Sequence, residues 1–442
     1  MPVRTARRCA GVPSGAFRLN LSVRVCAPSL LGQIHRPRRV LGALVFILAL
    51  VLAGAGVCRA QNRDVLCNDG AGNFYAEFRS GVSVRVEAAR NGELATRLCR
   101  AVLSWQNQKL VIADQVLQVD VDALGADFGL GTPVIAFQVK KSQDCCVNYE
   151  IYSLQKPPSL LRTITGGDFF SAADTDLDGE VEIWTDDAAA VDRFDGLGVG
   201  QMDFAPPVVL RFTRGKLLDV STEFQSYYDD KIAKLRADLN PQDLRDFKSS
   251  DGRLPAPVPF TVEAEHRRAQ LERVKIKILE IVWSYLYSGR EEAAWNALAE
   301  FWPAEDADRG QAAILRARAT GILTQLDGVS TEPAASRKSH ARIYDAIYET
   351  GNGKRAVIPP QPILLRRPPP PGASQQGLAL GEVFLFLVID SAGKVRFAEP
   401  ADDAKWFDVG LQGATATWKF IPAFKGDQAV ACRLTFVVTL KR

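Results

Sequence analysis

The acidic segment Asp174–Glu182 is the part of this chain whose residue types and spacing best suit a defined chemistry. It reads Asp-Thr-Asp-Leu-Asp-Gly-Glu-Val-Glu. Oxygen ligands at positions 1, 3 and 5, a glycine at position 6 for the tight bend, a backbone carbonyl at position 7 and a carboxylate at position 9 can surround a hard divalent cation. The carboxylates would otherwise repel one another, so the spacing predicts a structural calcium site.

An EF-hand does not fit this segment, because Thr185 stands where the bidentate Glu of position 12 is required. The flanking residues Asp168–Ala172 and Val181–Trp184 also have the character of strands. The segment instead resembles the calcium loop of FG-GAP or VCBS-type β-propeller blades, over about Thr132–Thr185. The resemblance implies side-chain ligands at Asp174, Asp176, Asp178 and Glu182, with Glu180 supplying its carbonyl. Only one copy of the loop occurs, whereas a full propeller needs several blades, and the alternative is a solvated acidic hairpin without a metal.

Residues 62–225, which position this loop, are predicted to be β-rich. Val82, Val84 and Val86 alternate with polar residues, as a strand with one solvated face requires. We expect a partial propeller-like or sandwich domain. Further strand-like runs lie at Leu110–Ala113, Pro133–Val139, Tyr149–Leu154 and Val208–Phe212.

The pattern becomes helical over residues 226–351. Apolar residues recur with helical spacing in Val262–Ser288, which predicts a helix with a broad buried face. Tryptophans at helical spacing belong to a core more often than to a binding groove, so we assign Trp283, Trp295 and Trp302 to the core. The other expected helices are Asp229–Leu239, Gln242–Phe247, Glu291–Phe301 and Arg309–Leu326.

Residues 377–442 carry the most family-specific pattern of the chain. Strand-like runs at Glu382–Ile389 and Lys394–Glu399 flank a turn, and a helical stretch, Asp402–Thr417, precedes a closing strand, Val430–Leu440. The C-terminal segment resembles the TonB C-terminal domain family. The resemblance implies a β-β-α-β domain in the periplasm that grips an outer-membrane protein, usually by adding a strand. It depends on the order of Gly381, Val383, Asp390, Gly393, Ala416, Trp418, Phe420, Pro422, Ala423 and Gly426.

A proline-rich linker, residues 352–376, precedes this domain. The family usually has a Tyr-Pro motif and a short helix there, and this chain has Pro359-Pro360-Gln361-Pro362 and Pro368–Pro371 instead. The proline-dense run covers about fourteen residues, which at about 3.1 Å per residue span roughly 40 Å. The linker alone is therefore too short to cross a periplasm.

Residues 1–60 form a basic leader with nine Arg and no Lys, Asp or Glu. The uncharged run Val40–Val57 follows Arg36, Arg38 and Arg39, which predicts export. Cleavage after Ala60 would give a periplasmic or secreted protein. The run is long for a signal core and short for a transmembrane helix, so the alternative is an inner-membrane anchor facing the periplasm.

The charge balance of the remaining chain argues against nucleic-acid binding. Without the nine arginines of the leader, 45 basic residues of the total of 54 face 51 acidic ones, a net charge of −6. A nucleic-acid-binding surface would be basic.

Export makes the cysteines candidates for disulfides, and four of them lie in the β-rich domain. Because adjacent cysteines rarely bond to each other, we expect Cys145 and Cys146 to pair with Cys67 or Cys99, in an order that the sequence leaves open. We expect Cys432, on the last strand, to be a buried free thiol. A metal or redox role for the adjacent pair is disfavoured because no Cys-x-x-Cys or histidine partner accompanies it.

The sequence contains no recognisable catalytic constellation. The histidines are His35, His266 and His340, and none accompanies a Gly-x-Ser-x-Gly or His-Glu-x-x-His motif. Paired carboxylates at Asp186-Asp187 and Asp402-Asp403 keep a secreted hydrolase as an alternative, although adjacent acids on exposed turns are mostly plain surface.

The sequence therefore predicts a multi-domain α+β protein, exported to the cell envelope, that acts by binding and not by catalysis. Its partner is expected to be an envelope or outer-membrane protein held by the C-terminal domain. If the leader is retained, the alternative is an anchored TonB-type energy transducer that also contacts the inner membrane. The partner's identity, the oligomeric state and the physiological process are not encoded in any recognisable motif.

Overall fold

A computed structural model of the chain describes residues 67, 73–90, 97–143, 145–197, 199–330, 342–345, 357–365, 381–400 and 409–440. The chain divides into two units, 1–62 and 63–442, and all described residues belong to the second. The predictions for the leader lie outside the described residues, as do those for most of the proline-rich linker. Strands and helices are mixed in an α+β arrangement of several small sheets. None of the described helices is long and apolar enough to cross a membrane.

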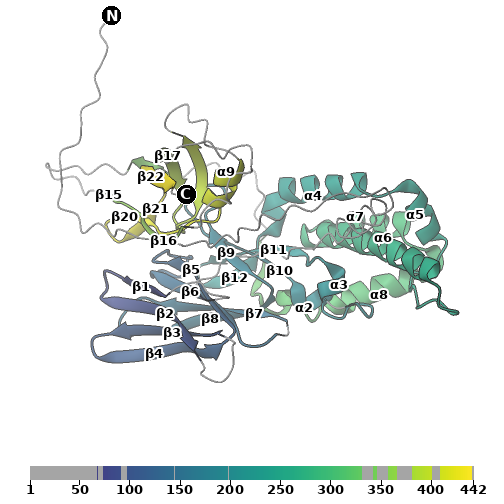
Figure 1. Ribbon diagram of the computed structural model, residues 1–442, viewed down its shortest axis with the longest axis horizontal. Helices are drawn as coiled ribbons and strands as arrows, with labels where there is room; N and C mark the ends of the chain where they lie inside the picture. The colour runs from purple at the N-terminus through teal and green to yellow at the C-terminus, as the bar shows by residue number, and fades with distance from the viewer. Residues whose placement is uncertain are drawn as a thin grey trace, which may run out of the picture. The chain divides into compact units, whose positions relative to one another are not determined.

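Three antiparallel meanders follow one another along the chain (Figure 1). The first has β1 (Phe74–Glu77), β2 (Val82–Arg90), β3 (Arg97–Trp105) and β4 (Gln108–Val116). The second has β5 (Gln118–Leu124), β6 (Val134–Lys140), β7 (Val147–Ser153) and β8 (Leu160–Gly167). The third has β9 (Phe170–Ala173), β10 (Glu182–Asp186), β11 (Pro207–Thr213) and β12 (Lys216–Asp219), and β13 (Gly328–Val329) extends it in parallel.

Burial follows the period-two pattern of the sequence. Val82, Val84 and Val86 of β2 are buried in a core that also holds residues of β5 and β6, so the first two sheets pack face to face. Nearly every residue of β6 is buried, because the second sheet is covered on both faces. The strands predicted around Val82–Val86, Leu110–Ala113, Pro133–Val139, Tyr149–Leu154 and Val208–Phe212 are confirmed.

The helices share a core with the second and third sheets. Asn240 caps the N-terminus of α5, and Thr261 caps that of α6. Trp283 and Trp302 are fully buried and Trp295 packs against the same core, so the assignment of these tryptophans to the interior is confirmed. The helices are α2 (Ala188–Val191), α3 (Val199–Met202), α4 (Gln225–Ala237), α5 (Pro241–Lys248), α6 (Val262–Tyr287), α7 (Glu291–Phe301) and α8 (Ala307–Arg318).

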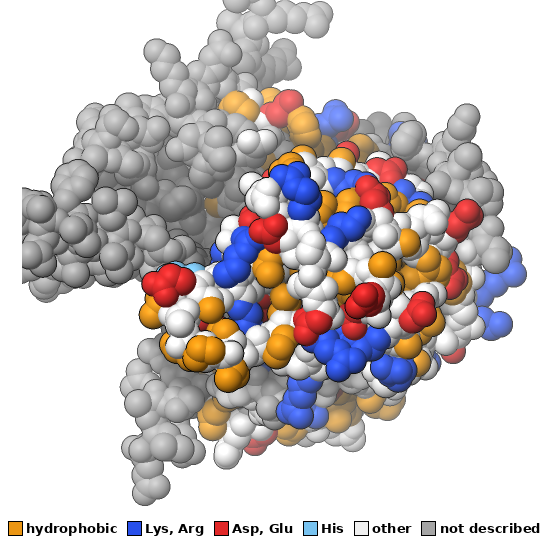
Figure 2. All heavy atoms as spheres, turned by 90° about the vertical axis from the view of Figure 1, so that its right-hand side faces the viewer, with side chains coloured by type: hydrophobic (Ala, Val, Ile, Leu, Met, Phe, Trp, Pro, Cys, Tyr) orange, Lys and Arg blue, Asp and Glu red, His pale blue; other side chains and the backbone are white. Residues whose placement is uncertain are grey.

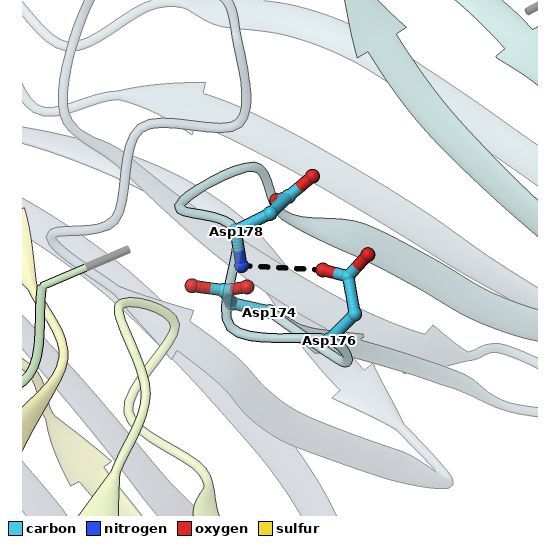
Figure 3. Close-up of side chains that lie close together, drawn as sticks. All are labelled: Asp174, Asp176 and Asp178. Carbon is cyan, nitrogen blue, oxygen red and sulfur yellow. Dashed lines mark hydrogen bonds between the residues drawn. The ribbon is translucent and has the colours of Figure 1, made fainter. Parts of the chain in front are cut away.

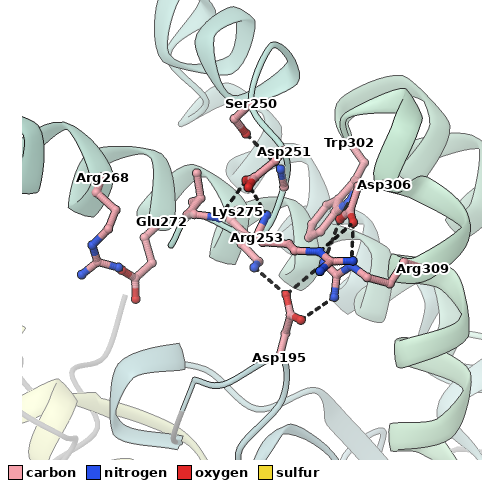
Figure 4. Close-up of polar contacts among 12 residues, drawn as sticks. Asp195, Ser250, Asp251, Arg253, Arg268, Glu272, Lys275, Trp302, Asp306 and Arg309 are labelled. Atoms are coloured by element: carbon pink, nitrogen blue, oxygen red, sulfur yellow. Dashed lines mark hydrogen bonds and ion pairs between the residues drawn. The ribbon is translucent and has the colours of Figure 1, made fainter. Parts of the chain in front are cut away.

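A polar network joins the helices to the loop between α2 and α3 (Figure 4). Asp195 accepts hydrogen bonds from Lys275 of α6 and Arg309 of α8, each at 2.5 Å. Arg309 also pairs with Asp306, which accepts from the indole of Trp302. The pKa of Asp195 is lowered because these two cations outweigh the effect of its burial. On the face over the helices, basic and acidic side chains are interspersed (Figure 2).

The C-terminal sheet has the order β14-β22-β17-β18. Its strands are β14 (Tyr344–Asp345), β17 (Gly381–Ile389), β18 (Val395–Pro400) and β22 (Cys432–Leu440). The helix α9 (Val409–Thr415) lies between β18 and β22 in the chain, and the start of the predicted helix at Asp402 falls outside the described residues. This sheet, α9 and five short strands together are called the C-terminal unit below. The short strands are β15 (Val357–Ile358), β16 (Gln361–Leu364), β19 (Lys419–Ile421), β20 (Ala423–Lys425) and β21 (Gln428–Val430).

A separate small core holds this sheet together. Leu385 and Leu387 of β17 pack with Trp418 and Phe420. The turn between β17 and β18 needs a glycine, because Gly393 has a φ of +85° and a Cβ there would overlap the carbonyl oxygen of Phe420.

The cysteine pairing differs from the prediction. Cys67 forms a disulfide with Cys99, and Cys145 forms one with Cys146. The expectation that each adjacent cysteine reaches Cys67 or Cys99 is therefore wrong. Cys67 lies in a bridge to β5 and Cys99 in β3, with their Cα atoms 5.8 Å apart, which suits a disulfide between them. Cys432 is a buried free thiol, as predicted.

Candidate metal centre

The acidic segment forms the loop between β9 and β10, and both flanking elements are strands, as predicted. Gly179 has a φ of +94°, which allows the tight bend. Backbone N–H groups hold the aspartates in place: Gly179 donates to Asp174 Oδ2, Asp178 to Asp176 Oδ1 and Glu180 to Asp178 Oδ1. Figure 3 shows the three aspartates close together, with the backbone N–H of Asp178 bonded to the Asp176 carboxylate.

The carboxylates of Asp174, Asp176 and Asp178 are close enough to share one ion. One oxygen of each lies within 4.8 Å of the others. Asp174 is completely buried, and its Oδ1 has no hydrogen-bond partner. A buried, unpaired carboxylate oxygen is costly, and a coordinated cation would remove that cost. The donor set, all oxygen, suits Ca²⁺ or Mg²⁺ better than a softer metal.

Among the described residues, the group of carboxylates that could share one ion does not include the side chains of Glu182 and Glu180, and the carbonyl ligand predicted for Glu180 stays a prediction. Glu182 is fully buried, accepts a hydrogen bond from the backbone N–H of Thr175 at 2.9 Å and lies 3.6 Å from the Arg211 guanidinium. The carboxylate of Glu180 pairs with the same Arg211 at 3.3 Å. Arg211 also forms a two-point ion pair with Glu223. One buried arginine therefore serves several carboxylates.

Burial raises the pKa of two carboxyls of this site, Asp174 and Glu182. It raises the pKa of Asp174 to about 6 and that of Glu182 to about 8, and the carboxylates of Asp176 and Asp178 add to both shifts. Hydrogen bonds from Gly179 and Ser391 to Asp174, and from Thr175 to Glu182, act in the opposite direction without cancelling the effect. The raised pKa values mean that the positive charge near these two carboxyls is too small to offset their burial and the neighbouring carboxylates.

The turn between β17 and β18, residues 390–394, reaches the loop from the C-terminal unit. Asp174 donates its backbone N–H to Asp390 Oδ2 at 3.0 Å, and the Ser391 hydroxyl donates to Asp174 Oδ2 at 3.1 Å. Arg396 donates to the carbonyl of Thr175 at 2.9 Å. Asp390 and Ser391 are both buried. The first residue of the acidic loop is thus held by a segment more than two hundred positions away in the chain.

The same unit provides two lysines to the neighbouring strand β5. Lys394 donates to Asp122 Oδ1 at 2.5 Å, and Lys419 pairs with Asp120. At Asp122 the two lysines outweigh burial, so its pKa is lowered. At Asp120 burial prevails and the pKa is raised, in spite of Lys419. Asp120 uses only Oδ2 for its hydrogen bonds, which it accepts from Lys419 and Gln138.

One of the two carboxylate pairs considered for a hydrolase, Asp186-Asp187, lies in the protein interior and not on the exposed turn that was expected. Asp186 and Asp187 are buried and do not lie on an exposed turn. Asp187 caps α2 and accepts hydrogen bonds from Ile322 N–H and the Tyr287 hydroxyl, and Asp186 accepts from the Asp168 N–H. Both therefore have structural roles. The other pair, Asp402-Asp403, lies outside the described residues.

Comparisons with known proteins add no assignment: neither protein-family models nor curated protein sequences match this chain. The residues that sequence reasoning missed are Arg211, Asp390, Ser391, Lys394 and Asp122. Asp390 had been assigned only to a hairpin turn. The two acids of β5 alternate with valines in Gln118–Leu124, a pattern that is typical of an ordinary solvated strand face.

Proposed function

We propose that this protein is an exported, non-catalytic binding protein of the cell envelope, whose C-terminal unit takes hold of an envelope or outer-membrane protein. The observation that carries the proposal is the antiparallel sheet order β18-β17-β22. In the chain, α9 lies between β18 and β22. That arrangement agrees with the β-β-α-β domain implied by the resemblance to the TonB C-terminal family. Its mode of binding would be the addition of an extended segment to a sheet edge.

The edge of β22 is the one we favour for this role. Its neighbour β14 pairs only with Cys432 and Arg433, so Leu434–Leu440 has a strand partner on one side alone among the described residues. β18 is less suitable because Pro400 lacks an N–H and Arg396 reaches the acidic loop. Val437 is 45% exposed on β22 and would lie beside the neighbouring side chains of an added strand.

Photo-crosslinking in cells tests this proposal. A photoreactive side chain at Val437 should give an adduct with an envelope protein, and one at the exposed Val111 of β4 should not. Separation of the cell fractions should place the adduct in the envelope. Recovery of the chain from the cytosol, or equal labelling from both positions, would contradict the proposal.

We also propose that the loop Asp174–Glu182 binds Ca²⁺ as a structural ion. The unpaired, fully buried Oδ1 of Asp174 supports this, together with the shared location of the three aspartates. Titration calorimetry of the full chain with Ca²⁺ should detect one site. The heat should disappear when Asp176 and Asp178 are replaced by Ala, and its presence in that variant would exclude this loop as the site.

The anchored energy transducer remains a second proposal, because it shares the C-terminal unit and differs only in the fate of residues 1–60. Determining the N-terminus of the protein recovered from the cell envelope separates the two. A start at Gln61 supports the soluble binding protein, and a start upstream of Val40 supports the transducer.

A further inference from the structure

The turn 390–394 contacts the acidic loop through polar groups that are shielded from water. Asp390 is completely buried and Ser391 is 5% exposed. Asp390 Oδ1 already accepts the N–H groups of Ala392 and Lys394, which form the turn, and its Oδ2 accepts the N–H of Asp174. Asp390 therefore fixes the backbone of the first loop residue while it fixes its own turn.

Ser391 completes the restraint on Asp174. Its hydroxyl donates to Oδ2, the same oxygen that accepts the N–H of Gly179. Oδ2 is thereby committed to protein donors, and the buried Oδ1 is left without one. Docking of the turn thus orients the carboxylate so that one oxygen remains for a cation.

The contact brings two carboxylates together, because Asp390 and Asp174 each carry a negative charge when ionised. The contact places the Asp390 carboxylate against the backbone of Asp174, so repulsion between the two ionised carboxylates opposes docking. A cation on Asp174 would reduce that repulsion, so a bound metal favours the docked turn. By thermodynamic linkage, the docked turn must then favour the bound metal by the same factor.

We propose that cation binding to the loop Asp174–Glu182 and docking of the turn 390–394 are coupled, so that metal loading fastens the C-terminal sheet to the β-rich part of the chain. The inference depends on the proposed metal site. Loss of the metal would weaken the loop contacts, while the lysines Lys394 and Lys419 on β5 and the contact of Phe78 with Phe424 would remain. The metal would in this way regulate how firmly the proposed binding module is held.

The first test is the calcium affinity of full-chain variants, measured by calorimetry. Ser391 carries no charge and is not a predicted ligand. The substitution Ser391→Ala should nevertheless weaken calcium binding roughly 5-fold or more, the lower end of typical coupling between sites. Lys394→Met gives a test of sign. Removal of a nearby positive charge would tighten calcium binding by simple electrostatics, whereas loss of docking should weaken it.

Lys425→Met is the matched control for Lys394→Met. Lys425 lies on β20 in the same unit, is exposed and contacts Tyr344, away from the loop. Its replacement should leave calcium affinity unchanged. If the Lys394→Met variant fails to fold, the calcium affinity of the Ser391→Ala variant alone decides whether the two sites are coupled. Unchanged affinity in Ser391→Ala, or tighter binding in Lys394→Met, would overturn the coupling.

Hydrogen exchange of the unmodified full chain provides an independent readout. Saturating Ca²⁺ should slow exchange in the loop and also in the segment Ile389–Arg396, compared with chelator. Protection of the loop alone would overturn the coupling while leaving the metal site intact. Absence of calcium binding in calorimetry would remove the metal site itself and the coupling with it.

Discussion

Two neighbouring groups of acids differ in what they receive from the C-terminal sheet and its short strands: the buried Asp120 and Asp122 on β5, and the aspartates of the β9–β10 loop, of which Asp174 is buried and Asp176 is exposed. The β5 acids receive lysines, Lys419 and Lys394. The loop receives the Asp390 carboxylate, the Ser391 hydroxyl and the Arg396 guanidinium, but no lysine on Asp174. The pKa of Asp122 is lowered, whereas burial raises the pKa of Asp120 in spite of Lys419 and that of Asp174 to about 6. The comparison shows that lysines offset burial at Asp122, whereas no lysine reaches Asp174 and its buried Oδ1 has no hydrogen-bond partner, which supports the proposed cation.

The largest effect is expected from breaking the β5 side of this comparison. Lys394→Met leaves Asp122 buried without its lysine, which typically costs about 3–5 kcal/mol. The unfolding free energy of the full chain in urea should fall accordingly. Adding Asp122→Asn should recover much of the loss, because position 122 then no longer holds a buried charge without its lysine. An equally unstable double variant would show that the ion pair is not the cause.

Removal of the metal tests the loop side. Calcium at a hundred times its dissociation constant should stabilise the wild type by about 2.7 kcal/mol relative to chelator. The variant with Asp176→Ala and Asp178→Ala should melt at the same temperature in both conditions. Equal melting of the wild type with calcium and with chelator would remove the metal hypothesis.

Lowering the pH should stabilise the metal-free loop, whereas most proteins lose stability in acid. Burial raises the pKa of Glu182 to about 8 and that of Asp174 to about 6, above their ordinary values of 4.5 and 3.8. The folded chain therefore binds more protons than the unfolded chain between about pH 4 and pH 8, so metal-free stability should fall as pH rises through that window. The lowered pKa of Asp122 contributes only below that window.

Thermal melting in chelator measures this dependence. The melting temperature should drop by roughly 2–6 °C between pH 5.5 and pH 8, and calcium should reduce the drop because it replaces the protons. A metal-free protein that becomes more stable across the same interval would contradict the assigned shifts.

The smallest effect should come from Glu180→Gln. The resemblance gives Glu180 only a backbone carbonyl role, and its carboxylate pairs with Arg211 at the surface. Calcium affinity should therefore change by less than about twofold, against tenfold or more for Asp178→Asn. Equal losses in the two variants would mean that the Glu180 side chain coordinates the ion.

Local sequence patterns identified many of the individual elements, although the helix expected over Arg309–Leu326 ends at Arg318 and is followed by a separate 3-10 turn, Ile322–Gln325. The alternation at Val82–Val86 identified β2, and the apolar spacing in Val262–Ser288 identified α6. The strands on both sides of the acidic loop were also predicted, which excluded an EF-hand. These predictions succeed because period and turn residues act over a few positions.

Contacts between distant segments were beyond the reach of those patterns. Asp122 and Lys394 are separated by 272 positions, and Asp174 and Asp390 by 216. Nothing in Gln118–Leu124 indicates that its acids are buried, because burial there depends on a sheet formed much later in the chain. The disulfide pairing was wrong for a related reason: Cys67 and Cys99 meet only when β3 and β5 are packed together.

Terbium luminescence of the full chain tests the central claim most directly. The indole of Trp184 donates a hydrogen bond to the Thr175 hydroxyl within the loop, at 2.7 Å, so it lies close enough to sensitise a lanthanide bound there. Excitation of the indole should produce terbium emission that calcium displaces, and Trp184→Phe should reduce the emission without changing the affinity. Absence of emission from the wild type, or equal emission from Trp184→Phe, would contradict a metal centre in this loop.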